Sequence, residues 1–478
     1  MNSEDFRKTG HELIDWMADY LDNIEKFPVK SQVKPKEIIT QLPDSPPEKG
    51  EPFTAIFHDF NELIIPGITH WQHPSFFAYF PANSSRISVL AEMITATIGA
   101  QCMSWETSPA ATELEERVME WLRQMLGLPA GFTGVIQDTA STATLCSLLT
   151  AREKLTDYEV NRTGLSSKEK FTIYSSSEAH SSIEKAVKIA GFGKGNLRKI
   201  PVDDNFALIP EKLEETIKSD KKAGFQPLCV VAATGTTGST AIDPLRPIGE
   251  ICKKYQLWLH VDAALSGSAL LLPEKRWMID GIEYADSFVF NPHKWLFTNF
   301  DCSAYFVKDP GALIQTFEIL PEYLKTEHGS RVNNYRDWGI QLGRRFRALK
   351  LWFVIRHYGI TGLQDKIRFH IAMTEELAKK IQEHEDFELL APVPVNTICF
   401  RFKPPDVDDL GQINTLNELI LKRLNATGKV YLTHTKLKEN YTIRFVIGQT
   451  EVQQRHVDEG WRLIQETASI VLNEHLNP

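Results

Sequence analysis

"LWLHVDA", residues 257–263, joins an apolar run rich in β-branched and aromatic residues to a single carboxylate. The run favours a strand, and Asp262 stands where that strand ends. Four similar runs, GVIQ, FTIYSS, LCVVAAT and SFVFN, alternate with helical stretches between residues 133 and 310. This alternation predicts an α/β fold with a mostly parallel central sheet. Ligands bind such sheets outside the carboxyl ends of the strands, so the chemistry is expected at those ends.

The segments that flank this alternation have different patterns. From Ser3 the chain shows an amphipathic helical stripe, which needs a surface to cover. Residues 108–127 have a capping serine, a proline at the first helical position and a terminal glycine. The apolar stripe expected for that helix consists of Leu114, Val118, Trp121 and Met125. After residue 365, the strands NTICFRF and YTIRFVIG and two long helices indicate a smaller α+β domain. The expected parts are an N-terminal helical segment (1–82), a large domain (83–365) and a C-terminal small domain (366–478).

Composition limits the classes of function. The 478 residues are enough for two or three subdomains, and the net charge of −9 argues against nucleic acid as a partner. The chain has no apolar run near the roughly 18 residues of a membrane helix, so we expect no membrane span. The six cysteines form no C-x-x-C pair, no histidine cluster has zinc spacing, and the first residues are polar and acidic. We therefore expect no metal and a cytoplasmic location.

Two strand ends lead into helix starts that can face a ligand. After GVIQ, the stretch DTASTATLCSLLTAREKL leads small hydroxylated residues into a helix, whose free N–H groups and positive end can bind a phosphate. Simple capping by Thr139 or Ser141 is the alternative. After FTIYSS, Ser181 and Glu184 have capping-box spacing, which places His180 just ahead of a helix. The loop ATGTTGST follows a third strand and is expected at the same edge of the sheet. The sequence contains neither a G-x-G-x-x-G nor a G-x-x-x-x-G-K-[ST] motif, which argues against nicotinamide and P-loop nucleotide sites.

One lysine lies among apolar and aromatic residues in VFNPHKWLF, residues 289–297. A buried ammonium is costly unless its charge is matched or its nitrogen is bonded, so Lys294 either reaches water or is chemically engaged. A phosphate cradle, His180, Asp262 and a lysine 32 residues after that aspartate together indicate pyridoxal 5'-phosphate (PLP). Lys294 would form an imine with PLP, Asp262 would keep the pyridine nitrogen protonated, and His180 would stack on the ring.

Eight blocks in this order resemble the group II PLP-dependent decarboxylases, and among them the aromatic-L-amino-acid decarboxylases most. The blocks are FFAYFPA, SPAATELE, DTASTATL, AHSSIEKA, HVDAALSGSA, NPHKWL, FDCSAYFVKD and LGRRFRALKLWF. The resemblance implies the type I, aspartate aminotransferase-like fold. It also implies an obligate homodimer with active sites at the subunit interface, in which the N-terminal helices of 1–82 wrap the partner and give the first helix its surface.

The resemblance assigns roles residue by residue. Lys294 matches the Schiff-base lysine, Asp262 the pyridinium partner and His180 the stacking histidine. Tyr323, which opens YLKTEHGSRVNNYRDW, matches a mobile-loop tyrosine that reaches the neighbouring subunit's site and assists protonation of the substrate carbon. Further positions around the cofactor, especially its phosphate, are Ala140, Ser141, Thr237 and Asn291. The substrate-binding positions are Trp71, Tyr79, Phe80, Ala82, Met103, His180 and Gly343.

The implied activity is that of a carboxy-lyase: decarboxylation of tryptophan, 5-hydroxytryptophan, DOPA, tyrosine or phenylalanine to the amine and carbon dioxide. The alternatives are an aromatic aldehyde synthase, whose relatives have Phe at the Tyr323 position, and a non-catalytic PLP-binding scaffold. A glutamate decarboxylase would need a cation for the second carboxylate, whereas the pocket stretch WQHPSFFAYF supplies mainly rings. This sequence departs from the family pattern at some of these positions. Animal enzymes commonly have Phe where Met103 stands and Thr where Ala82 stands, and DTAS stands in place of a Gly-Ser-Ala-Ser sequence. Gly343 resembles the small residue found in indole-accepting relatives.

Overall fold

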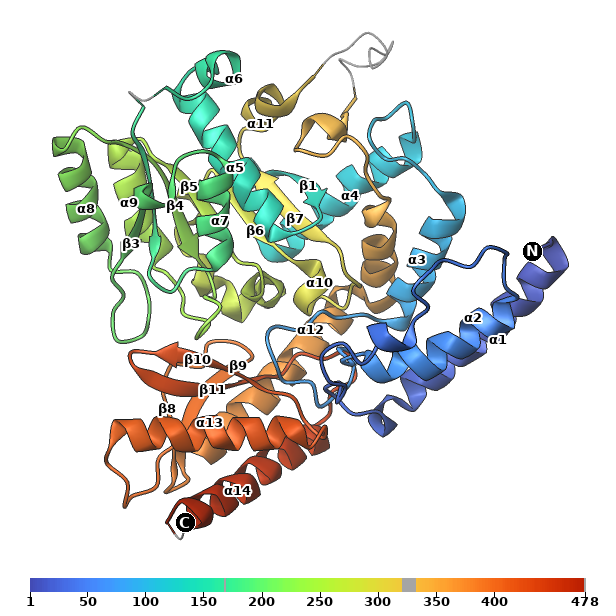
Figure 1. The fold of residues 1–478 in the computed structure, drawn as a ribbon. Coiled ribbons are helices and arrows are strands. Elements are labelled where there is room, and N and C mark those ends of the chain that lie inside the picture. The colour runs from blue at the N-terminus through green and yellow to red at the C-terminus, as the bar shows by residue number, and fades with distance from the viewer. Residues whose placement is uncertain (167–168, 320–331, 477–478) are drawn as a thin grey trace. The chain divides into compact units, whose positions relative to one another are not determined.

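The computed structural model describes residues 1–166, 169–319 and 332–476, and its chain divides into two compact units (Figure 1). The terminal unit comprises Met1–Pro81, Glu376–Leu389 and Phe400–Pro478. The central unit comprises Ala82–Glu375 and Leu390–Cys399. The division expected from the sequence, 1–82, 83–365 and 366–478, stays a prediction.

Within its described residues, the central unit is built on a seven-stranded sheet. Across the sheet the strands are β1 (Thr133–Gln137), β7 (Ser303–Val307), β6 (Ser287–Phe290), β5 (Trp258–Asp262), β4 (Gln226–Ala233), β2 (Phe171–Ser176) and β3 (Leu197–Ile200). Strand β7 is antiparallel to both of its neighbours, and the other adjacent pairs are parallel. The sheet is therefore mixed and mostly parallel, which confirms the expected α/β fold.

Helices surround this sheet. They are α3 (Arg86–Ile98), α4 (Pro109–Leu126), α5 (Ala140–Leu155), α6 (Glu159–Thr163), α7 (Ser181–Ile189), α8 (Pro210–Lys222), α9 (Leu245–Tyr255), α10 (Pro292–Trp295) and α11 (Pro310–Phe317). The short helices are η5 (Lys194–Asn196), η6 (Ser266–Leu271), η7 (Pro273–Ile279), η8 (Ile282–Tyr284) and η10 (Tyr335–Asp337). Helices α5 and α7 lie against the sheet through a buried apolar cluster that includes Leu148, Ile183 and Val231 (Figure 1). This packing fixes the starts of both helices beside the strand ends.

Helix α4 has the predicted ends but a different buried face. Ser108 occupies the cap position, although its side chain makes no capping bond, and Gly127 ends the helix at φ +72°. The predicted stripe is wrong at Leu114 and Trp121, which are only half-buried. The buried face instead includes Glu115, because a cation from a distant segment pairs with this carboxylate.

The terminal unit holds a second sheet and four of the longer helices. The described strands of this sheet follow the order β10 (Thr433–Leu437), β11 (Asn440–Val446), β9 (Thr397–Phe402) and β8 (Phe387–Leu389). Strand β9 is divided between the units after Cys399. The helices are α1 (Ser3–Asp22), α2 (Phe53–Asp59), α13 (Leu410–Ala426) and α14 (Gln454–Leu476), with α12 (Arg347–Gln382) shared by both units. The short helices are η1 (Ile24–Lys26), η2 (Ile39–Gln41), η3 (Phe60–Ile64) and η4 (Ile65–Gly67). All residues of the amphipathic α1 are at least partly exposed.

Two further properties concern the whole described chain. All six cysteines are buried, and none of them forms a disulfide within the described residues. No helix in the described part of the chain is both long and apolar enough to cross a bilayer.

Candidate active site

The predicted site residues of the central unit gather at one edge of its sheet. His180 follows β2, Thr237 follows β4, Asp262 ends β5, Lys294 follows β6, and Ala140 follows β1. These five strands run in the same direction, so their carboxyl ends share one edge. The topology therefore brings together side chains that are far apart in sequence, at the edge where such sheets bind ligands.

Asp262 is held by the strand that it ends. It lies in register with Ala233 of β4 and Val289 of β6. Its Oδ1 accepts the Ala264 N–H at 3.0 Å, and within the described residues no hydrogen bond ends on its Oδ2. Two residues earlier, burial lowers the pKa of His260 to about 4, while the Asp262 carboxylate acts against that shift. Asp262 can thus direct one oxygen toward a protonated nitrogen of a ligand.

His180 forms the start of α7. The structure corrects the expected cap: His180 itself, and not Ser181, is the capping residue. Its Nδ1 accepts the Ser182 N–H at 3.2 Å and lies 2.7 Å from the Ser182 hydroxyl, so the proton of the neutral ring is on Nε2. Burial lowers the pKa of His180, the Asp262 carboxylate opposes this shift, and the Lys294 cation adds to it. Both Asp262 and Lys294 therefore influence the His180 ring.

Lys294 is half-buried on the short helix α10, between two buried neighbours. The Trp295 indole donates to His370 Nδ1 at 2.9 Å, and His293 Nδ1 accepts the Cys302 N–H at 2.9 Å. Burial, together with the Lys294 charge, lowers the pKa of His293 to about 3, so this ring stays neutral. The anchored neighbours fix the backbone that presents the lysine.

Asn291 and the Thr237 loop are also held by hydrogen bonds. The Ser303 hydroxyl donates to Asn291 Oδ1 at 2.6 Å, and the Asn291 N–H donates to the Ala264 carbonyl at 3.0 Å. In the Thr237 loop, Thr236 Oγ1 accepts the Ala241 N–H at 3.0 Å. These bonds order the two loops on either side of the β5 end.

The start of α5 can bind an anion. Thr139 caps it, since Thr139 Oγ1 accepts the Thr142 N–H at 3.4 Å. Within the described residues, the backbone N–H groups of Ala140 and Ser141 have no hydrogen-bond acceptor. Capping by Thr139 and a pair of free donors therefore occur together, and the helix dipole adds a positive potential at the same point.

The substrate-binding positions of the central unit lie on neighbouring segments. Arg336 donates its N–H to the Met103 carbonyl at 2.8 Å, and Arg344 donates its N–H to Gln101 Oε1 at 2.7 Å. A Cβ at Gly343 would come within 3.2 Å of Gln101 Nε2, so even a small side chain there would require Gln101 to shift. Segments 101–103 and 336–344 thus run together. Ala82 precedes Asn83, whose N–H donates to the His293 carbonyl at 3.0 Å, beside Lys294.

The other substrate-binding positions lie in the terminal unit, and the predicted catalytic tyrosine is a separate case. Trp71 stacks on Tyr79 with ring centroids 5.7 Å apart, and the Arg444 guanidinium lies 5.2 Å from the Phe80 ring centroid. Trp71 and Tyr79 are exposed, at 37% and 48%. Tyr323 falls outside the described residues.

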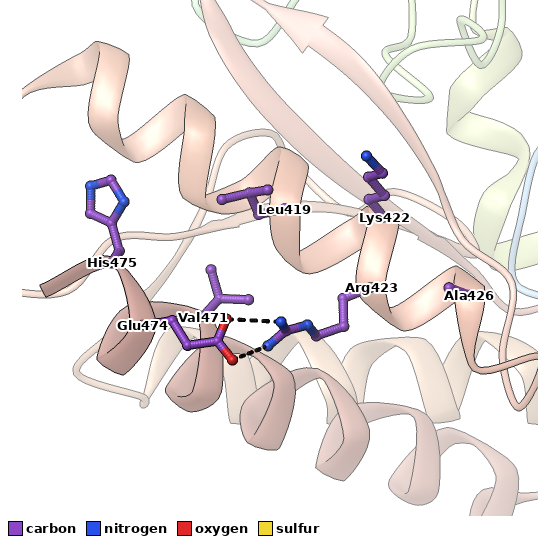
Figure 2. A pocket seen from close by; sticks show the side chains of 7 residues that line it. All are labelled: Leu419, Lys422, Arg423, Ala426, Val471, Glu474 and His475. Carbon is purple, nitrogen blue, oxygen red and sulfur yellow. Dashed lines mark hydrogen bonds and ion pairs between the residues drawn. The ribbon is translucent and has the colours of Figure 1, made fainter. Parts of the chain in front are cut away.

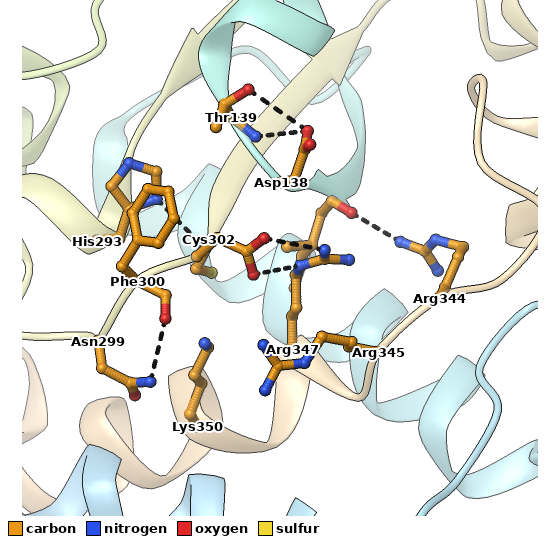
Figure 3. Close-up of polar contacts among 12 residues, drawn as sticks. Asp138, Thr139, His293, Asn299, Phe300, Cys302, Arg344, Arg345, Arg347 and Lys350 are labelled. Atoms are coloured by element: carbon orange, nitrogen blue, oxygen red, sulfur yellow. Dashed lines mark hydrogen bonds and ion pairs between the residues drawn. The ribbon is translucent and has the colours of Figure 1, made fainter. Parts of the chain in front are cut away.

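Sequence reasoning missed a buried ion pair that supports this region. Arg344 donates to Glu115 from both terminal nitrogens, at 2.6 and 3.1 Å, and to the Ile136 carbonyl at 2.7 Å. The signal available was the cationic run GRRFR, but nothing in the sequence identifies which arginine is buried. Figure 3 shows Arg344 with the neighbouring polar residues, among them Arg347 and Lys350.

One hollow lies apart from the predicted site residues. It has a volume of about 550 Å³ and lies between α13 and α14 of the terminal unit, where Arg423 pairs with Glu474 at 2.8 Å (Figure 2). None of the predicted site residues lines it. No group of three or more His, Cys, Asp or Glu side chains within the described ranges is arranged to hold a metal ion.

The edge of the central sheet fits PLP. Two free N–H donors at the start of a 16-residue helix suit a phosphate. Asp262 Oδ2, which accepts no hydrogen bond within the described residues, suits a protonated ring nitrogen. Lys294 supplies the amine that can bond to an aldehyde carbon. The neutral His180 ring is held at Nδ1 by the Ser182 N–H, so its face can lie against a flat ring.

Comparison with known proteins gives the same result. The family model described as the pyridoxal-dependent decarboxylase conserved domain matches residues 35–403. Tyrosine decarboxylase 2 of Narcissus pseudonarcissus is 44% identical, over 99% of this chain and 95% of its own. Phenylacetaldehyde synthase of Petunia hybrida is 42% identical, over 99% and 96%. The crystal structure of Oryza sativa TDC with PLP and tryptamine has a TM-score of 0.95 at 34% identity and 98% coverage of both chains. The resemblance seen in the sequence is confirmed, and the chain belongs to the pyridoxal-dependent decarboxylase family.

Proposed function

We propose that this enzyme decarboxylates an aromatic L-amino acid to the corresponding amine and carbon dioxide. The observation that carries the proposal is that His180, Asp262 and Lys294 lie at the carboxyl ends of parallel strands, which share one edge of the sheet. Relatives that match almost the whole chain are named as a tyrosine decarboxylase and as a phenylacetaldehyde synthase, which supports an aromatic substrate.

Each residue would have one task. When bound, PLP supplies an electron sink for the bond broken at the substrate Cα. Lys294 would hold the cofactor covalently, and the N–H groups of Ala140 and Ser141 would hold its phosphate. The Asp262 carboxylate would stabilise a proton on the ring nitrogen by charge. His180, with its proton on Nε2, would lie against the ring and donate a hydrogen bond to a substrate oxygen.

The proposed pocket favours a ring over a second carboxylate. Its expected lining consists of Trp71, Tyr79, Phe80, Ala82, Met103 and Gly343, none of which is a cation. An unpaired substrate carboxylate in such surroundings would be costly. Gly343 matches the small residue of indole-accepting relatives, which favours an indole. A panel of amino acids assayed for amine release tests the proposal, and preferential turnover of glutamate would reject it.

Tyr323 distinguishes the proposed activity from aldehyde synthesis. After carbon dioxide leaves, Cα needs a proton, and we propose that the Tyr323 hydroxyl assists its delivery. A positioned acid contributes roughly 10²–10⁴-fold, so Tyr323→Phe should slow protonation. Dioxygen should then oxidise the decarboxylated substrate, and with water this gives aldehyde, ammonia and hydrogen peroxide in place of amine. Amine, aldehyde and peroxide are measured together. An unchanged amine yield would remove Tyr323 from the mechanism.

We further propose a cytoplasmic homodimer. Helix α3 exposes Leu90, Met93, Ile94 and Ile98, at 38–60%, and α1 has an amphipathic pattern with no fully buried residue in its described length. Apolar faces of this kind favour association with a second copy. Light scattering should give the mass of a dimer. Mixing Tyr323→Phe subunits, which should make little amine, with inactive Lys294→Ala subunits should restore amine synthesis if the loop crosses the interface. Confirmed heterodimers without amine synthesis would reject that crossing. The six buried free thiols support a reducing compartment.

A further inference from the structure

Asp138 stands between β1 and Thr139, the capping residue of α5. The Thr139 N–H donates to Asp138 Oδ1 at 2.7 Å, as Figure 3 shows. A carboxylate is unexpected here, because Ala140 and Ser141, two and three residues further on, are proposed to hold a phosphate. Like charges so close together repel each other. The position therefore calls for a second role that favours an acid.

The second oxygen of Asp138 shows that role. Gln341 donates from Nε2 to Asp138 Oδ2 at 3.2 Å, across 203 positions of sequence. Gln341 lies two residues before Gly343, in the segment that lines the proposed substrate pocket. The preceding residue acts in the same way, since Gln137 Nε2 donates to the Trp338 carbonyl at 3.0 Å. Consecutive side chains at the end of β1 thus hold this segment at two points.

The far end of the segment is fixed independently. Arg344 binds Glu115 and the Ile136 carbonyl, and its N–H binds Gln101. Among the described residues 339–343, Gln341 is the one whose side chain hydrogen-bonds Asp138, the residue that follows β1. Loss of this bond would loosen the segment beside Gly343, while Trp338, Ile340 and Arg344 keep their contacts.

A nearby cation partly offsets the charge of Asp138. The Arg347 side chain is 7% exposed and donates to Asp301 at 2.9 and 3.2 Å. Burial acts to lower the pKa of Arg347, but the Asp301 hydrogen bond and the charges of Asp301 and Asp138 raise it overall. The charge of Asp138 is thus felt at Arg347, and it should also be felt at the start of α5.

We propose that Asp138 is a positioning residue which, through Gln341, fixes the segment carrying Gly343 for substrate binding, while its charge weakens phosphate binding at α5. The inference rests on the proposed function, because it takes the α5 start as the phosphate site and Gly343 as part of the pocket. It predicts that cofactor affinity and substrate affinity respond to different features of the same side chain.

Three variants separate the charge from the hydrogen bond. Asp138→Asn removes the charge, keeps an oxygen for the Thr139 N–H, and offers its amide to Gln341 Oε1 after the glutamine amide turns over. Gln341→Ala removes the bond and keeps the charge. Asp138→Ala removes both. The control is Gln124→Ala near the end of α4, where an exposed glutamine donates to Glu120 at 2.6 Å on the surface.

Two constants are measured for each protein. The first is the dissociation constant of PLP, from absorbance titration of the apoprotein. The second is KM for an aromatic amino acid at saturating PLP, compared with kcat. Asp138→Asn should bind PLP roughly three- to tenfold more tightly with an unchanged KM. Gln341→Ala should raise KM about fivefold, as expected for one lost hydrogen bond, with kcat and PLP affinity unchanged. Asp138→Ala should show both effects, and Gln124→Ala neither.

The outcomes separate this inference from the function on which it rests. A wild-type KM in Gln341→Ala would overturn the positioning role. Unchanged PLP affinity in both Asp138 variants would overturn the electrostatic part. The Asp138→Ala, Gln341→Ala double variant should have no higher KM than either single variant, and additive increases would show that the two residues act separately. If wild-type protein neither binds PLP nor releases amine, the proposed function itself fails.

Discussion

The buried pair Glu115–Arg344 is expected to determine whether the pocket segment is ordered. The two side chains are 3% and 6% exposed, and the carboxylate accepts from Arg344 at 2.6 and 3.1 Å and from the Ile136 N–H at 2.8 Å. Glu115→Gln keeps the shape but replaces one acceptor oxygen with an NH₂ that faces a guanidinium nitrogen. Arg344 is then a buried cation without its anion. Breaking one partner of a buried pair costs about 3–5 kcal/mol.

The measurement is urea unfolding of wild-type and variant protein under identical conditions. The matched control is Glu120→Gln on the same helix, where the pair with Arg123 is 2.6 Å long but its carboxylate is 39% exposed. A pair with this exposure contributes about 0–1 kcal/mol. We expect Glu115→Gln to lose several times more stability than the control, and to raise KM because Arg344 anchors the segment of Gly343. Equal losses in the two variants would refute the reasoning.

Two further predictions concern buried or site charges. Lys350 Nζ lies 3.0 Å from a Glu92 carboxylate oxygen, and burial lowers the pKa of Lys350 to about 8. Because the folded protein therefore releases this proton at a lower pH than the unfolded chain, the free energy of unfolding of the wild type should rise by about 2 kcal/mol between pH 7.5 and 9.5. Lys350→Met should abolish this rise, whereas the control Lys379→Met, at an exposed lysine, should retain it. Urea unfolding of each protein at both pH values measures the difference. Asp262→Asn should lose PLP on dialysis faster than wild type and turn over substrate far more slowly, because the ring nitrogen loses its counter-charge. Equal PLP retention would argue against that role.

The parts of the fold that depend on local pattern were predictable. The five runs named from the sequence form β1, β2, β4, β5 and β6. Strands β3 and β7 were missed: LRKI is partly polar, and SAYFV is too short for an apolar run to be told from a buried helical segment. Because β7 is the antiparallel strand, its absence from the prediction did not alter which strand ends meet.

The candidate site was likewise predictable only where it depends on local sequence pattern. The meeting of His180, Asp262 and Lys294 follows from the direction of parallel strands, which the alternation of elements predicts. The buried face of α4 does not, because Glu115 is buried by an arginine 229 positions away. The Asp138–Gln341 bond likewise joins two loops whose meeting no local period encodes. Tyr323 depends on resemblance alone.

The central claim is that Lys294 carries the cofactor, and borohydride tests it most directly. Reduction of the purified holoenzyme fixes the pyridoxyl group to its lysine, and peptide mass spectrometry then locates it. We expect the pyridoxyl group on Lys294 in wild-type protein, and neither that label nor significant amine release in a folded Lys294→Ala variant. A pyridoxyl group on another lysine in active wild-type enzyme, or a Lys294→Ala variant with normal turnover, would contradict the account.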